Sequence, residues 1–379
     1  MRILYFSDHG PYINTFIRQD VEHLSADHDV LYIATESDKQ LYNKKVRTKL
    51  VKYPSSSLKS RYSWRLEKLG LLFNWNNKNF ALRLKNEVDN FNPDIIHCQF
   101  LYESAKLLQN IKSKTPVIVN IRGYGASTKL VNKKYVDWLK KLANHNNIFP
   151  IYVCKHLKKN LISKNIIFKN EGIILYTGVD LKKFKRTKYD SKSNHKTFIQ
   201  VGAFNDKKGQ LITIKSFKKF VKNHENKNAK LVFIGEGKNL KKAKKLVINL
   251  DISEFVFFKG RLNQSEIIEE LNFADVFVHH SITSKKGDQE GIPNALVEAM
   301  AMEMPVLTTF HSGIPELVSH GLNGFLCEEN DFLTYSEQMN QIYNWGYIKE
   351  NRDMIEKKFS LKKHIEKLNE MYDLIKRNE

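Results

Sequence analysis

One segment of the chain, Gly287–Ala301, brings together residue types that can bind an anion and hydroxyl groups. Pro293 suits the first turn of a helix, and Ala295–Met302 is strongly helix-forming. A helix that begins near Pro293 directs free backbone N–H groups and the positive end of its dipole toward the preceding loop. Such a helix start binds phosphate or pyrophosphate without a cationic side chain, and Gly291 lets the backbone approach a ligand closely.

Two carboxylates flank this predicted anion site. Glu290 lies just before the helix, where it is too close to a phosphate to serve except as an acceptor for hydroxyl groups. Glu298 lies about two turns along, at about 1.5 Å rise per residue, and can accept from a second set of hydroxyls. This arrangement fits a sugar–pyrophosphate–ribose ligand. On spacing alone, an equally good explanation is that acidic residues near a helix start complement the dipole.

The elements that position this segment follow a regular alternation. Short apolar, β-branched runs alternate with longer amphipathic stretches, the pattern of parallel sheets covered by helices. The predicted strands are Ile3–Phe6, Val30–Ile33, Ile95–His97, Val117–Ile121, Ile151–Val153, Ile173–Leu175, Phe198–Val201, Leu231–Ile234, Val256–Phe258, Val276–His279, Val306–Thr309 and Phe325–Cys327. We therefore expect two doubly wound α/β sheets facing a cleft, with ligands bound outside the carboxyl ends of the strands.

The polar stretch 185–196 has almost nothing to bury, so we place the domain boundary there. The expected organisation is a first domain at 1–184, this linker, a second domain at 197–345, and C-terminal helices at 346–379 that pack back toward the first domain. The first residues, 1–8, are too soon polar for a signal peptide and predict a buried strand instead.

Composition narrows the class of protein. A chain of 379 residues with 41% hydrophobic residues predicts two folded domains and excludes wholesale disorder. Apolar runs stay well short of the roughly 18 residues of a membrane-spanning helix. Three widely separated cysteines suggest neither a disulfide framework nor a zinc site. We expect a soluble, cytoplasmic protein, whose net charge of +21 leaves nucleic acid, a membrane surface and a phosphorylated substrate open as partners.

The chemistry-bearing segment resembles the Glu-x7-Glu motif of glycosyltransferase family 4, which comprises retaining sugar transferases with the GT-B fold. It is especially similar to the branch that builds bacterial exopolysaccharides such as colanic acid and amylovoran. Glu290 and Glu298 match the two glutamates. Other similar blocks run nearly end to end: Asn14–Ile17, Tyr176–Leu181 with Phe184, Val201–Gly202, Lys207–Gly209, His311–Val318, Asn323–Leu326 and Met354–Tyr372.

The resemblance implies an α/β GT-B fold of two Rossmann-like domains facing a cleft, with C-terminal helices crossing back to the first. It implies that Glu290 and the backbone of 291–294 contact the donor sugar and its phosphates, that Glu298 binds the ribose, and that Lys208 neutralises the donor pyrophosphate. The donor-binding residues implied in this way are Gly202, Lys208, Glu290, Gly291, Ile292, Pro293, Asn294 and Glu298.

The same resemblance implies transfer of a sugar, with retention of configuration, from a nucleotide diphosphate sugar to a saccharide acceptor. The expected donor is a UDP-sugar, with a GDP-sugar as the alternative, and neither a metal nor another cofactor is expected. The expected acceptor is a lipid-linked saccharide in the biosynthesis of exopolysaccharide, capsule or lipopolysaccharide. The protein would then work in the cytoplasm or peripherally on the inner face of the cell membrane.

Two positions depart from the family pattern in ways that matter for charge. Ala203 stands where an arginine usually follows the glycine, so one leaving-group cation is missing unless Lys207 or another lysine replaces it. Arg122 stands where the family has a histidine that faces the donor sugar. Arg122 therefore joins Glu290 and Lys208 as a candidate catalytic residue. It either binds a phosphate or a carboxylate-bearing sugar or is a structural substitute.

Other polar residues are candidates because of their place along the chain. Asn14 and Thr15 follow the first predicted strand, where either can cap the next helix and leave its N–H groups open to the cleft. His97 ends a strand and either contacts acceptor or donor or packs in the core, the commoner role of a lone histidine. His279 and His280 alternate faces of a strand, so they cannot easily bind one metal together. We predict structural roles for both, with a place in the lining of the loop into the site as the alternative for His280.

About half of the charge surplus lies in Leu41–Asn86, which contains 12 Lys or Arg and a single acid, Glu67. Apolar residues recur there at helical spacing, with tryptophans close by: Tyr62, Trp64, Leu66, Leu69, Phe73 and Trp75. A basic amphipathic helix with tryptophans is typical of an element attracted to an anionic membrane surface. The alternative is an apolar stripe that packs on the core beneath a solvated lysine face.

Two other functions compete with a glycosyltransferase. Another enzyme of the same fold, such as a phosphorylase or a nucleotide-sugar epimerase, is disfavoured by the Glu290–Glu298 spacing together with Gly313–Val318. A non-enzymatic basic module that binds nucleic acid lacks support, because we find no recognition-helix, zinc or RNA-binding signature. We therefore expect no nucleic-acid partner.

Overall fold

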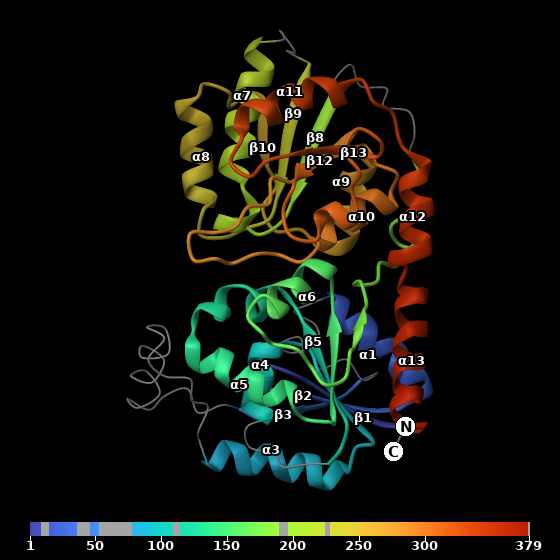
Figure 1. Ribbon diagram of the computed structural model, residues 1–379. Coiled ribbons are helices and arrows are strands. Elements are labelled where there is room, and N and C mark those ends of the chain that lie inside the picture. Colours follow the sequence, from blue (N-terminus) through green and yellow to red (C-terminus); the bar gives the residue numbers. More distant parts are fainter. Residues whose placement is uncertain are drawn as a thin grey trace. The chain divides into compact units, whose positions relative to one another are not determined.

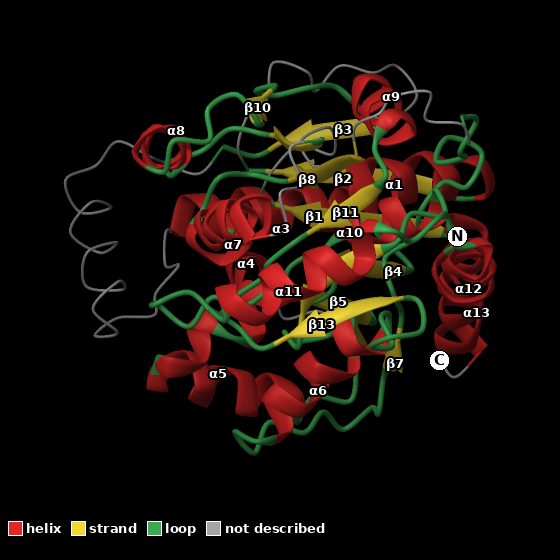
Figure 2. Cartoon of the chain, turned by 90° about the horizontal axis from the view of Figure 1, so that it is seen from above, coloured by secondary structure: helices red, strands yellow, loops and turns green. Residues whose placement is uncertain are grey.

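The computed structural model describes residues 1–8, 15–35, 46–52, 78–108, 114–188, 196–223 and 228–377. The chain divides into two compact units, residues 1–178 with 364–379 and residues 179–363 (Figure 1). Each unit is built on one parallel sheet, and Figure 2 shows helices on either side of the strands. Within the described part of the chain, no helix is long and apolar enough to cross a membrane.

The first unit contains a seven-stranded sheet in the order β3-β2-β1-β4-β5-β6-β7, with every neighbouring pair parallel. Its strands are β1 (Arg2–Ser7), β2 (Asp29–Ala34), β3 (Arg47–Leu50), β4 (Ile95–Cys98), β5 (Val117–Ile121), β6 (Ile148–Tyr152) and β7 (Ile173–Ile174). Its helices are α1 (Thr15–Asp27), α3 (Lys78–Phe91), α4 (Leu101–Leu108), η1 (Gly123–Ala126), η2 (Thr128–Val131), α5 (Lys133–Ala143), α6 (Lys155–Ile162) and most of α13 (Leu361–Arg377).

Helices α1 and α13 cover one face of this sheet. Ile17 and Val21 of α1, together with Leu368 and Tyr372 of α13, join the buried cluster formed by the strands. The final helix therefore completes the core of the first unit. Strand β3 was missed in the sequence because an edge strand with the sequence Arg47–Leu50 buries little and shows no apolar run.

The second unit contains a six-stranded sheet in the order β10-β9-β8-β11-β12-β13, again parallel throughout. Its strands are β8 (Lys196–Val201), β9 (Ala229–Ile234), β10 (Val256–Phe258), β11 (Val276–Val278), β12 (Val306–Thr309) and β13 (Gly324–Cys327). Its helices are η3 (Asp206–Lys208), α7 (Gln210–Asn223), α8 (Leu240–Asn249), α9 (Gln264–Phe273), α10 (Asn294–Ala301), η4 (Ile314–Glu316), α11 (Phe332–Tyr343) and α12 (Lys349–Phe359).

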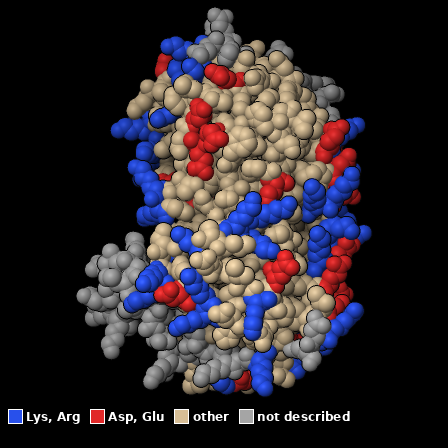
Figure 3. All heavy atoms as spheres, viewed as in Figure 1, with Lys and Arg blue, Asp and Glu red and all other residues tan. Residues whose placement is uncertain are grey.

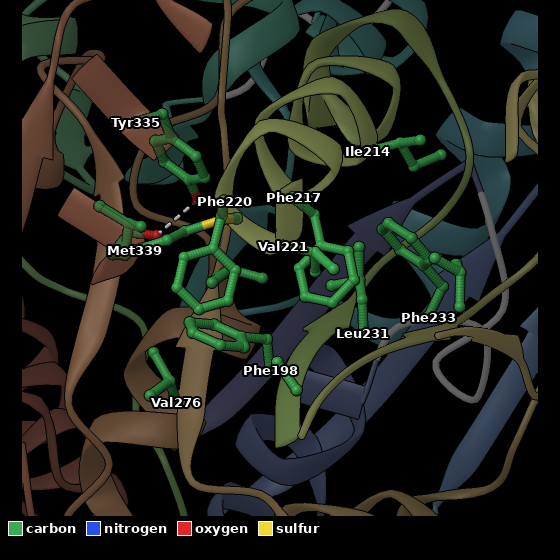
Figure 4. Close-up of a cluster of buried hydrophobic side chains, with 14 of the residues drawn as sticks. Phe198, Ile214, Phe217, Phe220, Val221, Leu231, Phe233, Val276, Tyr335 and Met339 are labelled. Carbon is green, nitrogen blue, oxygen red and sulfur yellow. Dashed lines mark hydrogen bonds between the residues drawn. The ribbon is translucent and has the colours of Figure 1, made fainter. Parts of the chain in front are cut away.

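One face of the second sheet packs against α7, α8 and α11 through an aromatic cluster (Figure 4). Phe198 of β8 lies edge-on to Phe217 and Phe220 of α7, with ring centroids 6.1 and 5.4 Å apart. Tyr335 of α11 is fully buried, and its hydroxyl donates to the Leu307 carbonyl at 2.8 Å. Strands β8, β11 and β12 all contribute to this cluster, and they carry the loops described below.

The strand order places a topological switch point between β8 and β11, because the chain winds outward from these neighbours in opposite directions. In open parallel sheets, ligands bind at such a point, outside the carboxyl ends of the strands. The loops that leave these ends contain Gly202–Gly209 after β8 and His279–Pro293 after β11. Segments some 80 residues apart in sequence, carrying Lys208 and Glu290, meet there at hydrogen-bond distance.

Two details of the expected organisation differ in the structure. Arg186, which we placed in a linker with nothing to bury, is buried in the second unit. Its guanidinium donates to carbonyls at the ends of α9 and α10, including Met302 O at 2.8 Å and Leu271 O at 2.9 Å. Helix α12, which we expected to pack toward the first domain, belongs to the second unit, because Asn351 and Arg352 bond to the backbone there.

Helix α8 shows where part of the positive charge lies. It buries Ala243 and Val247, whereas its four lysines (Lys241, Lys242, Lys244 and Lys245) are exposed. Figure 3 shows blue side chains along the edge of the second unit where this helix lies. This face is a solvated lysine surface. The basic helix predicted around Tyr62–Phe73, and the candidate cap Asn14, lie outside the described residues.

Candidate functional site

An ion pair between Lys208 and Glu290 lies at the switch point of the second sheet. The Lys208 ammonium contacts both carboxylate oxygens, Oε1 at 2.7 Å and Oε2 at 2.8 Å. The Glu290 side chain is 8% exposed and that of Lys208 is 16% exposed. A cation and a carboxylate held together at a parallel-sheet switch point can contact the phosphate and the hydroxyl groups of one ligand.

The backbone around Lys208 is fixed by a tight turn. Lys208 ends the 3₁₀ turn η3, and Gly209 follows at φ 62°, in the left-handed region. A Cβ on Gly209 would come within 1.8 Å of the His280 carbonyl oxygen, so the position requires glycine. The Lys208 carbonyl accepts from the Gln200 side chain at 2.7 Å. A Cβ on Gly202 would lie 3.5 Å from the Lys208 side chain, so this glycine leaves room for the lysine stem.

A buried histidine relay fixes the loop that carries Glu290. The Glu290 N–H donates to His311 Nε2 at 3.2 Å, so Nε2 is the acceptor and the ring proton resides on Nδ1. That proton is donated to Glu329 Oε1 at 2.5 Å. Glu329 in turn accepts from the backbone N–H of Thr283 at 2.7 Å. The relay therefore ties the start of the loop, its Glu290 end and the segment after β13 into one unit.

Several cationic or polar side chains surround the Glu290 carboxylate and set its pKa. Burial acts to raise the pKa of the Glu290 carboxyl, but the Lys208 ammonium, with His279 and Lys207, outweighs it and holds the pKa well below its usual range. Glu290 is therefore ionised at all ordinary pH values. Lys207 is itself paired with Asp288 at 3.1 Å, at the outer side of the same loop.

Helix α10 begins directly after this loop, as the sequence predicts. Pro293 precedes its first residue, and no side chain among the described residues caps it, so its first N–H groups stay available to a ligand. The Gly291 carbonyl accepts from Gly313 N at 3.1 Å, which holds the loop before the helix. Ile292 and Asn294 are both partly exposed beside it.

Glu298, on the first turns of α10, is a different kind of carboxylate. Within the part of the chain that the structure describes, no hydrogen-bond or ion-pair partner reaches its side chain, which is partly exposed. Burial raises the pKa of Glu298 to about 7, with Lys208 acting weakly in the opposite direction. It is an acceptor without a donor, which suits a ligand that supplies hydroxyl groups.

Of the remaining predicted residues, Arg122 and His97 lie in one largely buried polar cluster of the first unit, linked through Gln99. Arg122 donates to Thr177 Oγ1 at 3.2 Å and to Gln99 Oε1 at 3.4 Å, and its guanidinium lies 4.2 Å above the Phe16 ring. Arg122 Nε is buried without a hydrogen-bond partner among the described residues. Of the candidates near the first loop, Thr15 is the first residue of α1.

His97 lies in the same cluster and is 1% exposed. Its Nε2 donates to Asn120 Oδ1 at 3.1 Å, and its Nδ1 accepts from the Tyr372 hydroxyl of α13 at 2.6 Å. Burial lowers the pKa of His97 to about 4, so the ring stays neutral. Nδ1 joins the last helix to the sheet and Nε2 joins β4 to β5, so the packing interpretation accounts for the position of His97.

Sequence reasoning did not single out three residues of the second-unit site. The hydrogen bonds of His311 to Glu290 and Glu329 were not predicted, although His311 begins the His311–Val318 block that resembles the family. His279 was predicted to be structural, yet its ring lies against Glu290, with Nε2 at 3.7 Å from Oε2. The signal for His279 in the sequence was its position at the end of the strand that precedes the Glu290 loop.

Residues 182–361 match the family model described as glycosyl transferases group 1. The second unit is a group 1 glycosyltransferase domain. The resemblance seen in the sequence is confirmed at this level, whereas the narrower assignment to family 4 stays a prediction.

The chain is also similar to individual glycosyltransferases. It is 33% identical over 154 residues to the amylovoran biosynthesis glycosyltransferase AmsK of Erwinia amylovora, a match covering 41% of this chain and 37% of AmsK. It is 28% identical over 298 residues to the uncharacterized glycosyltransferase MJ1178 of Methanocaldococcus jannaschii, covering 76% and 78% of the two chains. The match therefore spans well under two thirds of the length of AmsK.

Among solved structures, HepE of Anabaena in complex with UDP and glucose superimposes with a TM-score of 0.77 at 16% identity, covering 98% of this chain and 99% of that one. At that identity the likeness establishes the fold alone. With the two parallel sheets, it confirms the predicted α/β fold of the GT-B type.

Proposed function

We propose that this protein transfers a hexosyl group, with retention of configuration, from a nucleoside diphosphate sugar to a saccharide acceptor. The observation that carries the proposal is the largely buried Lys208–Glu290 pair at the start of α10, with the Glu298 carboxylate on the same helix. Among the residues that the structure describes, no side chain caps this helix and none pairs with Glu298. A glycosyltransferase domain with this arrangement has separate groups for phosphate, sugar and ribose.

Each group has a distinct task in this proposal. The Lys208 ammonium and the free N–H groups of α10 bind the donor diphosphate, and they stabilise the negative charge that grows on it as the sugar leaves. Glu290 accepts from hydroxyl groups of the sugar, and Glu298 accepts from the ribose hydroxyls. Arg122 of the first unit is a further candidate cation for an anionic group of a substrate. No metal ion is needed for these roles.

UDP is the nucleotide to test first, because a protein of the same fold was crystallised with UDP and glucose. A ligand that binds the folded state alone raises the unfolding midpoint, by about 2.7 kcal/mol of stability at 100 times its Kd. We expect UDP and UDP-sugars to raise it in the wild type and much less in Lys208→Met. Lys241→Met, which removes an exposed lysine of α8, is the matched control and should respond like the wild type.

Enzymatic outcomes separate the alternatives. A glycosyltransferase releases UDP from a UDP-sugar in the presence of an acceptor, and Glu290→Ala should abolish this release while the fold is retained. Conversion of the sugar within an intact UDP-sugar would indicate an epimerase, and phosphate-dependent cleavage of a glycan would indicate a phosphorylase. Stabilisation by GDP rather than UDP would change the donor and keep the reaction class.

For the acceptor we propose a lipid-linked saccharide of a cell-surface polysaccharide, since AmsK is named for amylovoran biosynthesis. A protein acting on such an acceptor benefits from contact with an anionic membrane. The surplus of positive charge in Leu41–Asn86 supports binding to such a membrane. Salt-sensitive co-sedimentation with anionic liposomes is the expected result. Lack of sedimentation at low salt would remove the membrane from the proposal.

A further inference from the structure

His279 is a buried histidine in the candidate site whose ring, among the described residues, makes no hydrogen bond. The residue is 0% exposed, and neither ring nitrogen has a hydrogen-bond partner within the described residues. A polar ring buried in this way is costly, and most buried polar side-chain groups in folded proteins have a partner. Packing alone does not require a histidine here, because the ring stacks on Phe277 at 6.0 Å, as an apolar ring would.

The ring is held in place by its backbone. The His279 N–H is directed at the Tyr335 hydroxyl at 3.0 Å and at Leu307 O at 2.9 Å, and its carbonyl accepts from Thr308 Oγ1 at 2.7 Å. This fixed ring and the Lys208 side chain lie over the same glycine: a Cβ on Gly202 would be 3.7 Å from His279 Cε1 and 3.5 Å from Lys208 Cε.

The two neighbours of Glu290 differ in mobility. Lys208 contacts both carboxylate oxygens of Glu290 through a flexible four-carbon stem. His279 directly follows β11, and its Nε2 lies 3.7 Å from Glu290 Oε2. A shift of about 0.5–1 Å brings that contact into the hydrogen-bond range. Lys207, the other cation near Glu290, is engaged by Asp288.

Binding of a diphosphate creates a conflict at this pair. If the ammonium of Lys208 turns to the diphosphate, Glu290 is left as a buried carboxylate without its counter-ion, which is strongly unfavourable. A second donor that is already in place removes this penalty. Neutral imidazole carries one N–H and supplies that donor without placing a further positive charge beside Lys208.

We propose that His279 is a positioning residue that takes over the carboxylate of Glu290 when Lys208 turns to the donor diphosphate. Glu290 thereby keeps the orientation in which it meets the sugar while its partner changes from lysine to histidine. The step involving the diphosphate rests on the proposed function, whereas the contact between His279 and Glu290 rests on the structure of the free protein.

A ligand-free experiment tests the exchange itself. In Lys208→Met the ammonium is absent, so His279 Nε2–H should bond to Glu290, and the ring should titrate between about pH 5 and 8. In the wild type, burial and the nearby Lys208 lower the pKa of His279, with Glu290 opposing them and His311 adding to them, so the ring stays neutral. NMR of the ¹⁵N-histidine-labelled full chain reads both the tautomer and the slowly exchanging ring N–H.

His280 provides an internal control in the same spectra. It is equally buried, but its Nε2 accepts from Asn330 N at 3.1 Å and its ring lies against Tyr335. Its signals should not change in Lys208→Met. If the His279 ring N–H in that variant forms no hydrogen bond, the inference is overturned, whatever the protein does with nucleotides.

UDP binding then tests the role in the donor complex. His279→Phe keeps the ring and removes the donor, so the UDP Kd should rise about 10- to 100-fold, as for a hydrogen bond to a charged group. His279→Gln restores an N–H near Nε2 and should recover most of the affinity. The Phe substitution should have little further effect in Glu290→Gln, because His279 acts through that carboxylate.

The outcomes separate this inference from the proposed function. A His279–Glu290 bond in Lys208→Met together with no binding of UDP would refute the proposed donor and leave the exchange standing. UDP binding that is equally tight in the wild type and His279→Phe would refute the exchange and leave the donor standing. An equal loss of affinity in the Glu290→Gln background would assign His279 a packing role instead.

Discussion

Glu298 gives the sharpest quantitative prediction, because burial raises the pKa of its carboxyl and no described residue pairs with it. Its pKa is raised from 4.5 to about 7, a difference worth about 3 kcal/mol at about 1.36 kcal/mol per pH unit. Partial exposure screens some of this penalty, so we expect about 2–3 kcal/mol. Glu298→Gln keeps the shape of the side chain and removes the ionisation.

The sign follows from the raised pKa. As pH increases from 4.5 to about 7, the unfolded chain releases the Glu298 proton before the folded chain does, so the wild type loses stability over this window. Glu298→Gln lacks this loss. The variant should therefore match the wild type near pH 4.5 and be more stable by about 2–3 kcal/mol at pH 8.

Urea denaturation followed by circular dichroism at several pH values between 5 and 8 measures this difference. Glu337→Gln, an exposed glutamate of α11, is the matched control and should follow the wild type. With saturating UDP at pH 8 the wild type should become the more stable of the two proteins. Ribose hydroxyls that donate to Glu298 favour its charged form, which Glu298→Gln lacks. UDP affinity should therefore rise with pH more steeply in the wild type. Parallel stability curves for the wild type and Glu298→Gln would refute the reasoning.

Two further predictions concern the frame of the second unit. Gly209→Ala should destabilise the protein by several kcal/mol more than Gly260→Ala in thermal or urea unfolding. Both glycines have positive φ, at 62° and 71°, but a Cβ at Gly209 would collide with the His280 carbonyl, whereas nothing lies within 4 Å at Gly260. Arg186→Met should lower the free energy of unfolding by about 3 kcal/mol or more, because it leaves buried carbonyls such as Met302 O without a donor. A urea midpoint equal to that of the wild type would contradict this prediction.

Periodicity in the sequence predicted most of the fold, since a buried parallel strand is an apolar run that needs little context to be recognised. Val256–Phe258 and Val306–Thr309 were placed at the residues where β10 and β12 lie. The edge strand β3 escaped because Arg47–Leu50 is half solvated and has no apolar run. Arg186 was misplaced in a linker because its partners are backbone carbonyls of distant helices, which leave no local pattern.

The sequence by itself determined the residue types and the helix start of the site, because Glu290, Pro293 and Glu298 lie within nine residues on one loop and helix. Tertiary structure decided how charge is shared among them. The strand order brings Lys208 and His279 to the same carboxylate across a switch point. Lys208 then outweighs burial and lowers the pKa of Glu290, whereas burial dominates at Glu298 and raises its pKa. Coulomb energy and desolvation depend on distances and exposure, which exist only after the chain has folded.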